Sequence, residues 1–157
     1  MQNLPHHYAV AATASAKGNV DLTSPGLARI DSAPPAEFGG PGDRWSPETL
    51  LVAAVADCFV LTFKAIARAS KMDWICLSCD VEGILDRVDN LSKFTEFNLR
   101  VVLQAPPGTD EQKALRILQK SERSCLITNS LNSETHLDAE VRIAESTNQG
   151  EIVAAPL

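Results

Sequence analysis

The stretch VAAVADCFVLTF, residues Val52 to Phe63, is a nearly unbroken apolar run with a cysteine, Cys58, in its middle. A helix start precedes it, because Ser46-Pro47-Glu48 places a hydroxyl N-cap before a proline and an acid in the first turn. We therefore predict one long buried helix from Pro47 to about Lys71. An apolar helix of this length must be covered by other elements, so it decides the fold.

Cys58 lies on a face of this helix that carries small side chains. Polar residues follow one narrow stripe that consists of Asp57, Lys64, Arg68 and Lys71. Cys58 lies about 100° around the helix from Asp57. The face of Cys58 holds Ala54, Thr62, Ala65 and Ala69. Two interpretations stay open. The cysteine is a small hydrophobe in a core, or its small neighbours leave room beside a reactive thiol.

The segments before the helix predict a small antiparallel sheet and a loop. Three short runs are separated by glycine-containing turns, which is typical of a hairpin followed by a third strand: His7–Ala14, Asn19–Thr23 and Leu27–Asp31. From about Ser32 to Ser46, prolines and glycines exclude regular structure. A loop of this length is usually functional or mobile.

The segments after the helix predict a long hairpin, a second helix and a last strand. Trp74–Val88 and Lys93–Gln104 are rich in β-branched and aromatic residues around a polar turn. Thr109-Asp110-Glu111 opens a helix that reaches about Arg123, and Thr135–Ala144 alternates as a strand does. We expect Ser146–Leu157 to be a loose tail. The pattern predicts an α+β fold in a single domain over residues 1–157, with its core at about 7–145.

Composition excludes several classes of function. The chain has 157 residues, 45% hydrophobic residues and a formal net charge of −6, which fits one domain and offers no basic surface for nucleic acid or an anionic membrane. The most apolar window carries Asp57 and is shorter than the roughly 20 residues of a membrane span. MQNLPHHYAV lacks the features of a signal peptide, so we expect a cytoplasmic protein with reduced thiols.

Four cysteines, Cys58, Cys76, Cys79 and Cys125, are too few for a disulfide scaffold. Cys76 and Cys79 form a C-x-x-C motif, but it lies inside a predicted strand, where residues three apart point to opposite faces. We interpret this pair as structural. No histidine spacing completes a zinc site. Cys125 follows the cationic end of the second helix and precedes a polar turn, so it is the candidate partner for a sulfenic acid at Cys58.

Glu48 and Arg44 are candidate site residues of a different kind. On one straight helix Glu48 and Cys58 are separated by about 15 Å and some 80° of rotation. The glutamate therefore serves Cys58 only if the helix breaks near its start or a second copy of the chain supplies it. Otherwise it is a first-turn acid favoured by the helix dipole. Arg44 is the nearest candidate cation, or a solvated loop charge.

Two segments resemble one known family. PETLLVAAVADCF, Pro47 to Phe59, is similar to the Glu- and Cys-containing helix of the OsmC/Ohr proteins, the osmotically induced and organic hydroperoxide resistance proteins. SCLITNSL, Ser124 to Leu131, resembles their second-cysteine segment. The order of predicted elements also matches. The resemblance spans about residues 7–145.

The resemblance implies a peroxidase for organic hydroperoxides in an intertwined homodimer, whose sheets wrap the central helices. Cys58 would be the peroxidatic cysteine and Cys125 the resolving one, with which it forms a disulfide. Glu48 would hold an arginine that stabilises the Cys58 thiolate. No metal or bound cofactor is implied, and the reductant would be an external dithiol of the lipoyl type.

The chain departs from the family at the arginine. Lys17 and Phe38 stand at the two positions where the family carries it, so Arg44 and Lys17 are the candidate cations. A lysine lacks the planar fork of arginine. The alternative function is an OsmC-fold protein without peroxidase activity that binds an apolar small ligand at the dimer interface. A third hypothesis is a scaffold whose interface is its function.

Overall fold

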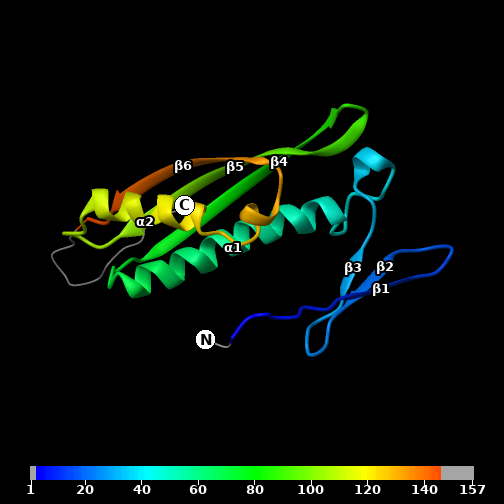
Figure 1. Ribbon diagram of the computed structural model, residues 1–157, viewed down its shortest axis with the longest axis horizontal. Coiled ribbons are helices and arrows are strands. Elements are labelled where there is room, and N and C mark those ends of the chain that lie inside the picture. Colours follow the sequence, from blue (N-terminus) through cyan, green and yellow to red (C-terminus); the bar gives the residue numbers. More distant parts are fainter. Residues whose placement is uncertain (1–2, 146–157) are drawn as a thin grey trace. The chain divides into compact units, whose positions relative to one another are not determined.

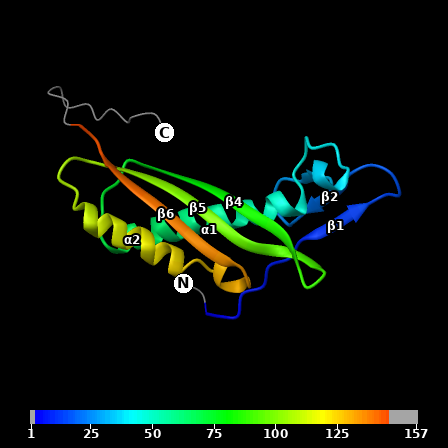
Figure 2. The same ribbon diagram turned by 90° about the horizontal axis from the view of Figure 1, so that it is seen from above.

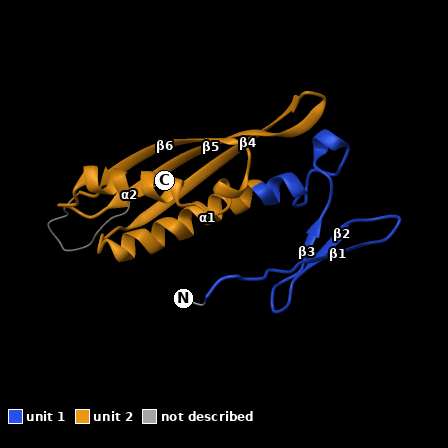
Figure 3. Cartoon of the chain, in the orientation of Figure 1, with its two compact units in different colours: residues 1–51 blue, residues 52–157 orange. Residues whose placement is uncertain are grey.

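A computed structural model describes residues 3–145. The chain divides into two compact units, Met1–Leu51 and Val52–Leu157 (Figure 3). The expected single domain over 1–157 stays a prediction, and the tail expected at Ser146–Leu157 lies outside the described residues. Both sheets and both long helices that the sequence predicts are present, so the α+β class is confirmed.

The first unit contains a three-stranded antiparallel sheet in the order β1-β2-β3. Its strands are short: β1 is Ala11–Ala14, β2 is Val20–Thr23 and β3 is Ile30–Ser32. The strand expected from His7 begins only at Ala11. The loop expected without regular structure contains one 3-10 turn, η1 (Ala36–Phe38), and a bridge in which the Ala33 N–H donates to the Trp45 carbonyl at 3.0 Å.

The helix α1, Pro47–Ala69, begins where the sequence predicts. The Thr49 N–H donates to the Ser46 hydroxyl at 3.2 Å, while the Ser46 N–H donates to the Thr49 hydroxyl at 2.8 Å, a reciprocal cap. The helix ends two residues before the expected Lys71. That lysine takes a left-handed φ of 49°, and the next N–H, of Met72, donates back to the Ala67 carbonyl at 3.0 Å.

The second unit is a three-stranded sheet covered on one face by helices (Figures 1 and 2). The strands β4 (Cys76–Val88) and β5 (Leu91–Ala105) form the predicted antiparallel hairpin, and β6 (Glu134–Ile143) pairs with β5 in parallel. The turn uses Asp89 and Asn90 at φ 52° and 65°, as a tight hairpin requires. Between β5 and β6 come α2 (Glu111–Arg123), capped by Asp110, and the 3-10 turn η2 (Thr128–Ser130).

The core lies between the helices and the sheet. Alternate residues of β5 are buried, and α1 buries one residue per turn at a spacing of four. The buried apolar side chains of these elements are Val55, Phe59, Phe63 and Ala67 of α1, Phe97, Leu99, Val101, Leu103 and Ala105 of β5, and Ala114, Ile117 and Leu118 of α2. In the described part of the chain, α1 is the one helix long and apolar enough to cross a membrane by length and composition.

Candidate functional site

The second unit brings Cys58 and Cys125 together. Cys58 is in the middle of α1, and Cys125 follows the end of α2 by two residues. The Cys58 and Cys125 thiols interact, since each contributes to the pKa of the other. Cys125 is only 1% exposed, whereas Cys58 is half-buried. Cys58 is therefore the thiol with more access to solvent.

The chain after α2 curls around Cys125. The Cys125 carbonyl accepts from the Asn129 N–H at 3.1 Å and from the Thr128 hydroxyl at 3.2 Å. The N–H groups of Ile127 and Thr128 and the Thr128 side chain act to lower the pKa of the Cys125 thiol. Backbone donors of this kind stabilise a negative charge on sulfur, because they replace the water that burial removes.

The two thiols have opposite pKa shifts. Burial raises the pKa of the Cys58 thiol, and the hydrogen bond it donates to Cys125 raises it further. The Ile127 N–H and the Thr62 hydroxyl, one helical turn along α1, act in the lowering direction. Burial also acts to raise the pKa of Cys125. There, however, the hydrogen bonds from Cys58, from the hydroxyl and N–H of Thr128 and from the Ile127 N–H outweigh burial, so the pKa of Cys125 is lowered.

Cys76 and Cys79 are both inside β4, as predicted. They pair in register with Gln104 and Val101 of β5, and their spacing of three places them on opposite faces of the sheet. Cys79 shares the helix-covered face with Val101. Burial raises the pKa of the Cys79 thiol to about 12, with smaller contributions from Asp80 and Cys125. It is therefore an inert neutral thiol at ordinary pH.

Glu48 and Arg44 belong to the first unit, where Arg44 has other partners. Its Nε lies 2.8 Å from Asp31, and its Nη1 lies 2.9 Å from Asp43. Hydrogen bonds from Asn19 and from Arg44 lower the pKa of Asp31. One carboxylate oxygen of Glu48 is buried with no hydrogen-bond partner among residues 3–145. α1 is unbroken from Pro47 to Ala69, so the break considered for Glu48 does not occur. The catalytic roles expected of both residues stay predictions.

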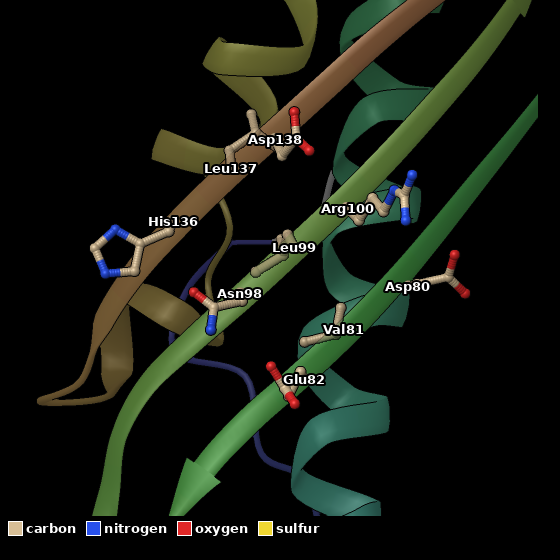
Figure 4. Close-up of a pocket in the computed structure, with 9 residues that line it drawn as sticks. All are labelled: Asp80, Val81, Glu82, Asn98, Leu99, Arg100, His136, Leu137 and Asp138. Atoms are coloured by element: carbon tan, nitrogen blue, oxygen red, sulfur yellow. The ribbon is translucent and has the colours of Figure 1, made fainter.

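The open face of the sheet carries a separate cavity of about 450 Å³ (Figure 4). Its polar walls come from cross-strand neighbours: Arg100 of β5 lies in register between Asp80 of β4 and Asp138 of β6. These side chains are exposed and carry opposite charges, as a solvated sheet face does. Within residues 3–145, no group of three or more His, Cys, Asp or Glu side chains is placed to hold a metal ion.

A family model, that of the OsmC-like proteins, matches residues 40–140. The matched region contains α1, the hairpin, α2 and the turn around Cys125. The chain belongs to the OsmC-like family. The family assignment drawn from PETLLVAAVADCF and SCLITNSL is thereby confirmed, and so is the OsmC-like fold.

Three OsmC-like or related proteins indicate how far this chain has diverged. It is 27% identical over 143 residues to the uncharacterized protein YmaD of Bacillus subtilis, covering 88% of this chain and 95% of the relative. An OsmC-like protein of unknown function from Vibrio cholerae superimposes with a TM-score of 0.78 at 18% identity, over 86% of this chain and 99% of that one. An organic hydroperoxide resistance protein OsmC from Legionella pneumophila superimposes with a TM-score of 0.64 at 26% identity. The match covers 88% of this chain and 98% of the Legionella chain.

Sequence reasoning missed part of this OsmC-like site. The sequence places Thr62 only on the small-residue face and Thr128 only in a polar turn, yet the Thr62 side chain acts to lower the pKa of Cys58 and the Thr128 side chain that of Cys125. For Thr62 a usable signal was present, because a hydroxyl four residues after a helical cysteine shares its face. The N–H groups of Ile127 and Thr128 give no side-chain signal.

Proposed function

We propose that the protein is a thiol peroxidase that reduces organic hydroperoxides through Cys58 and Cys125. The observation that carries the proposal is the mutual effect of these two thiols on each other's pKa, with Cys58 half-buried and Cys125 only 1% exposed. Such a pair has both parts that thiol peroxidation needs, a nucleophile and a second thiol within bonding reach. The Legionella relative named as an organic hydroperoxide resistance protein supports the substrate class.

In the proposed cycle the Cys58 thiolate attacks the distal oxygen of ROOH. The O–O bond breaks, the alkoxide takes a proton and leaves as alcohol, and Cys58 becomes a sulfenic acid. The Cys125 thiolate then attacks the oxidised sulfur and displaces hydroxide, which closes the disulfide. An external dithiol, of the lipoyl type, reduces the disulfide by thiol–disulfide exchange and is itself oxidised. We propose that no metal or bound organic cofactor takes part.

The proposal includes a homodimer. The first unit exposes apolar side chains, among them Tyr8 at 93%, Val10 at 71% and Leu27 at 71%, and such surfaces mark protein contacts. The buried Glu48 oxygen without a partner favours a donor supplied by a second copy of the chain. Arg44 and Lys17 are the proposed sources of that donor. We further propose a cytoplasmic location, where a dithiol reductant is available and the thiols stay reduced.

The test is to treat reduced protein with one equivalent of cumene hydroperoxide and to map disulfides by mass spectrometry. We expect a Cys58–Cys125 bridge and loss of the hydroperoxide, with hydrogen peroxide as the comparison substrate. Cys58→Ser should consume no hydroperoxide above background. Cys76→Ala is the matched control and should react as the unaltered chain does.

The proposal fails if no such bridge appears and Cys58→Ser removes the hydroperoxide as fast as the unaltered chain. That result would favour the alternative, an OsmC-like protein that binds an apolar ligand.

A further inference from the structure

The cavity of about 450 Å³ lies on the face of the β4–β5–β6 sheet that the helices leave open (Figures 2 and 4). Cys58, on α1, and Cys125, just after α2, belong to the helix-covered side. Six polar side chains line the cavity in two neighbouring rows of the sheet, each in register: Asp80, Arg100 and Asp138, then Glu82, Asn98 and His136. The volume is that of a small-molecule pocket. The cavity is therefore separate from the proposed peroxidase site.

Arg100, at the centre of the first row, has no charged partner. Among residues 3–145 its guanidinium forms no ion pair and no hydrogen bond, although an aspartate lies beside it in register on each neighbouring strand. Arg142, on the same face, is paired: it donates to both carboxylate oxygens of Glu140, at 2.8 and 3.0 Å. The fork of donors of Arg100 is thus available to a ligand.

The acids of the cavity are available in the same way. Within residues 3–145, Asp80, Glu82 and Asp138 form no ion pair, and no side chain donates a hydrogen bond to them. Carboxylates outnumber the guanidinium three to one. The cavity therefore presents one cationic group between two anionic ones, with an excess of negative charge.

We propose that this cavity binds a basic amino acid of the lysine or arginine type. The α-carboxylate pairs with the fork of Arg100, which matches a carboxylate in two parallel hydrogen bonds. The α-ammonium and the cationic end of the side chain pair with Asp80 and Asp138. Neighbouring strands are about 4.8 Å apart, so the two aspartates stand roughly 10 Å apart at the backbone, a gap that their side chains and an extended ligand bridge.

The charge pattern selects this class over simpler ions. A diamine matches the two aspartates but brings no carboxylate to Arg100, and an acidic amino acid is repelled by the excess of carboxylates. Because Asp80, Arg100 and Asp138 are all exposed, water screens each pair, and we expect affinity in the millimolar range. Asn98, half-buried in the next row, offers both a donor and an acceptor to the ligand.

The binding test is a titration of the reduced, ¹⁵N-labelled full chain with L-lysine at constant ionic strength, followed by amide NMR shifts. We expect saturable shifts centred on Asn98–Arg100. Cadaverine, which is lysine without its carboxylate, should bind about threefold or more weakly, as expected from the loss of one exposed ion pair. Equal binding of lysine and cadaverine would reduce the cavity to a generic acidic surface and overturn the proposal, as would the absence of saturable shifts.

Two matched variants assign the carboxylate contact. Arg100→Gln should lose the preference for lysine over cadaverine, while cadaverine still binds and reports that the sheet is intact. Arg142→Gln, which removes the paired arginine of the same face, should keep the preference. A preference that survives in Arg100→Gln, or that is lost equally in both variants, overturns the assignment. The result does not depend on peroxide chemistry, so the site stands or falls separately from the proposed function.

Discussion

Two pairs of cysteines lie in the second unit, and they differ in what separates their members. Cys76 and Cys79 are three residues apart, yet β4 turns them to opposite faces of the sheet. Cys58 and Cys125 are 67 residues apart, yet α1 and the end of α2 bring their thiols close enough to shift each other's pKa. Sequence spacing alone is therefore a poor guide to thiol pairing, because the secondary structure decides which side chains share a face.

The surroundings differ as much as the spacing does. Cys79 is half-buried with only burial and negative neighbours acting on it, and its pKa rises to about 12. Cys125 is more deeply buried but surrounded by donors, and its pKa falls. Burial by itself makes a thiol inert, whereas burial with aimed N–H and O–H groups favours the thiolate. The predictions below test this contrast, from the largest expected effect to the smallest.

The largest expected effect is on stability after oxidation. A Cys58–Cys125 disulfide closes a long loop and should raise the free energy of unfolding by about 4 kcal/mol. Urea unfolding of protein treated with one equivalent of hydroperoxide, compared with reduced protein, measures it. Cys58→Ser should show no rise, because Cys76 and Cys79 point apart and cannot replace the bridge. A rise of similar size in Cys58→Ser would contradict the comparison.

The next effect concerns the hydroxyl groups of Thr128 and Thr62. Thr128→Val keeps the shape but removes a donor to Cys125, and hydrogen bonds to charged groups are worth about 1.5–3 kcal/mol. We expect the thiolate fraction near neutral pH to fall about tenfold, measured by ultraviolet titration.

Thr62→Val is the matched control, because Thr62 donates to Cys58 alone. The Thr62→Val variant should leave the ionisation of Cys125 unchanged. Equal losses in both variants would mean that the charge is shared evenly between the sulfurs.

Sequence reasoning predicted the elements better than the site. The start of α1 at Ser46-Pro47, the Asp110 cap of α2 and the Asp89-Asn90 turn are local signals, and each appears where expected. Strand edges were less well placed: β1 begins at Ala11 instead of His7, because the exposed residues before it, Tyr8 and Val10 among them, continue the apolar pattern of a strand. The pairing of Cys58 and Cys125 depends on how distant elements pack, so their positions in the sequence made Cys125 only a candidate partner, and the family resemblance gave it the resolving role.

A smaller effect is expected from the raised pKa of Cys79. The folded protein keeps this proton up to about pH 12, while the unfolded chain releases it near 9.0. The neutral Cys79 thiol therefore stabilises the fold fully below pH 9, and this stabilisation is lost as pH rises towards 12. For a half-buried thiol, the free energy of unfolding should fall by at most about 1 kcal/mol per pH unit. Urea unfolding between about pH 9 and 10 should show that the free energy of unfolding falls less steeply with pH in Cys79→Ala than in the unaltered chain. An equal slope in the two proteins would contradict this prediction.

The smallest effect is expected at Cys76, the other member of the C-x-x-C motif. It lies on the face of β4 that the helices do not cover, so Cys76→Ser removes no core contact and should change the free energy of unfolding by less than about 0.5 kcal/mol. Hydroperoxide consumption should also be unchanged, since the strand points this thiol away from the Cys58–Cys125 pair. A loss of turnover in Cys76→Ser, with stability intact, would mean that the motif relays electrons to the pair, and the contrast between the two pairs would then be wrong.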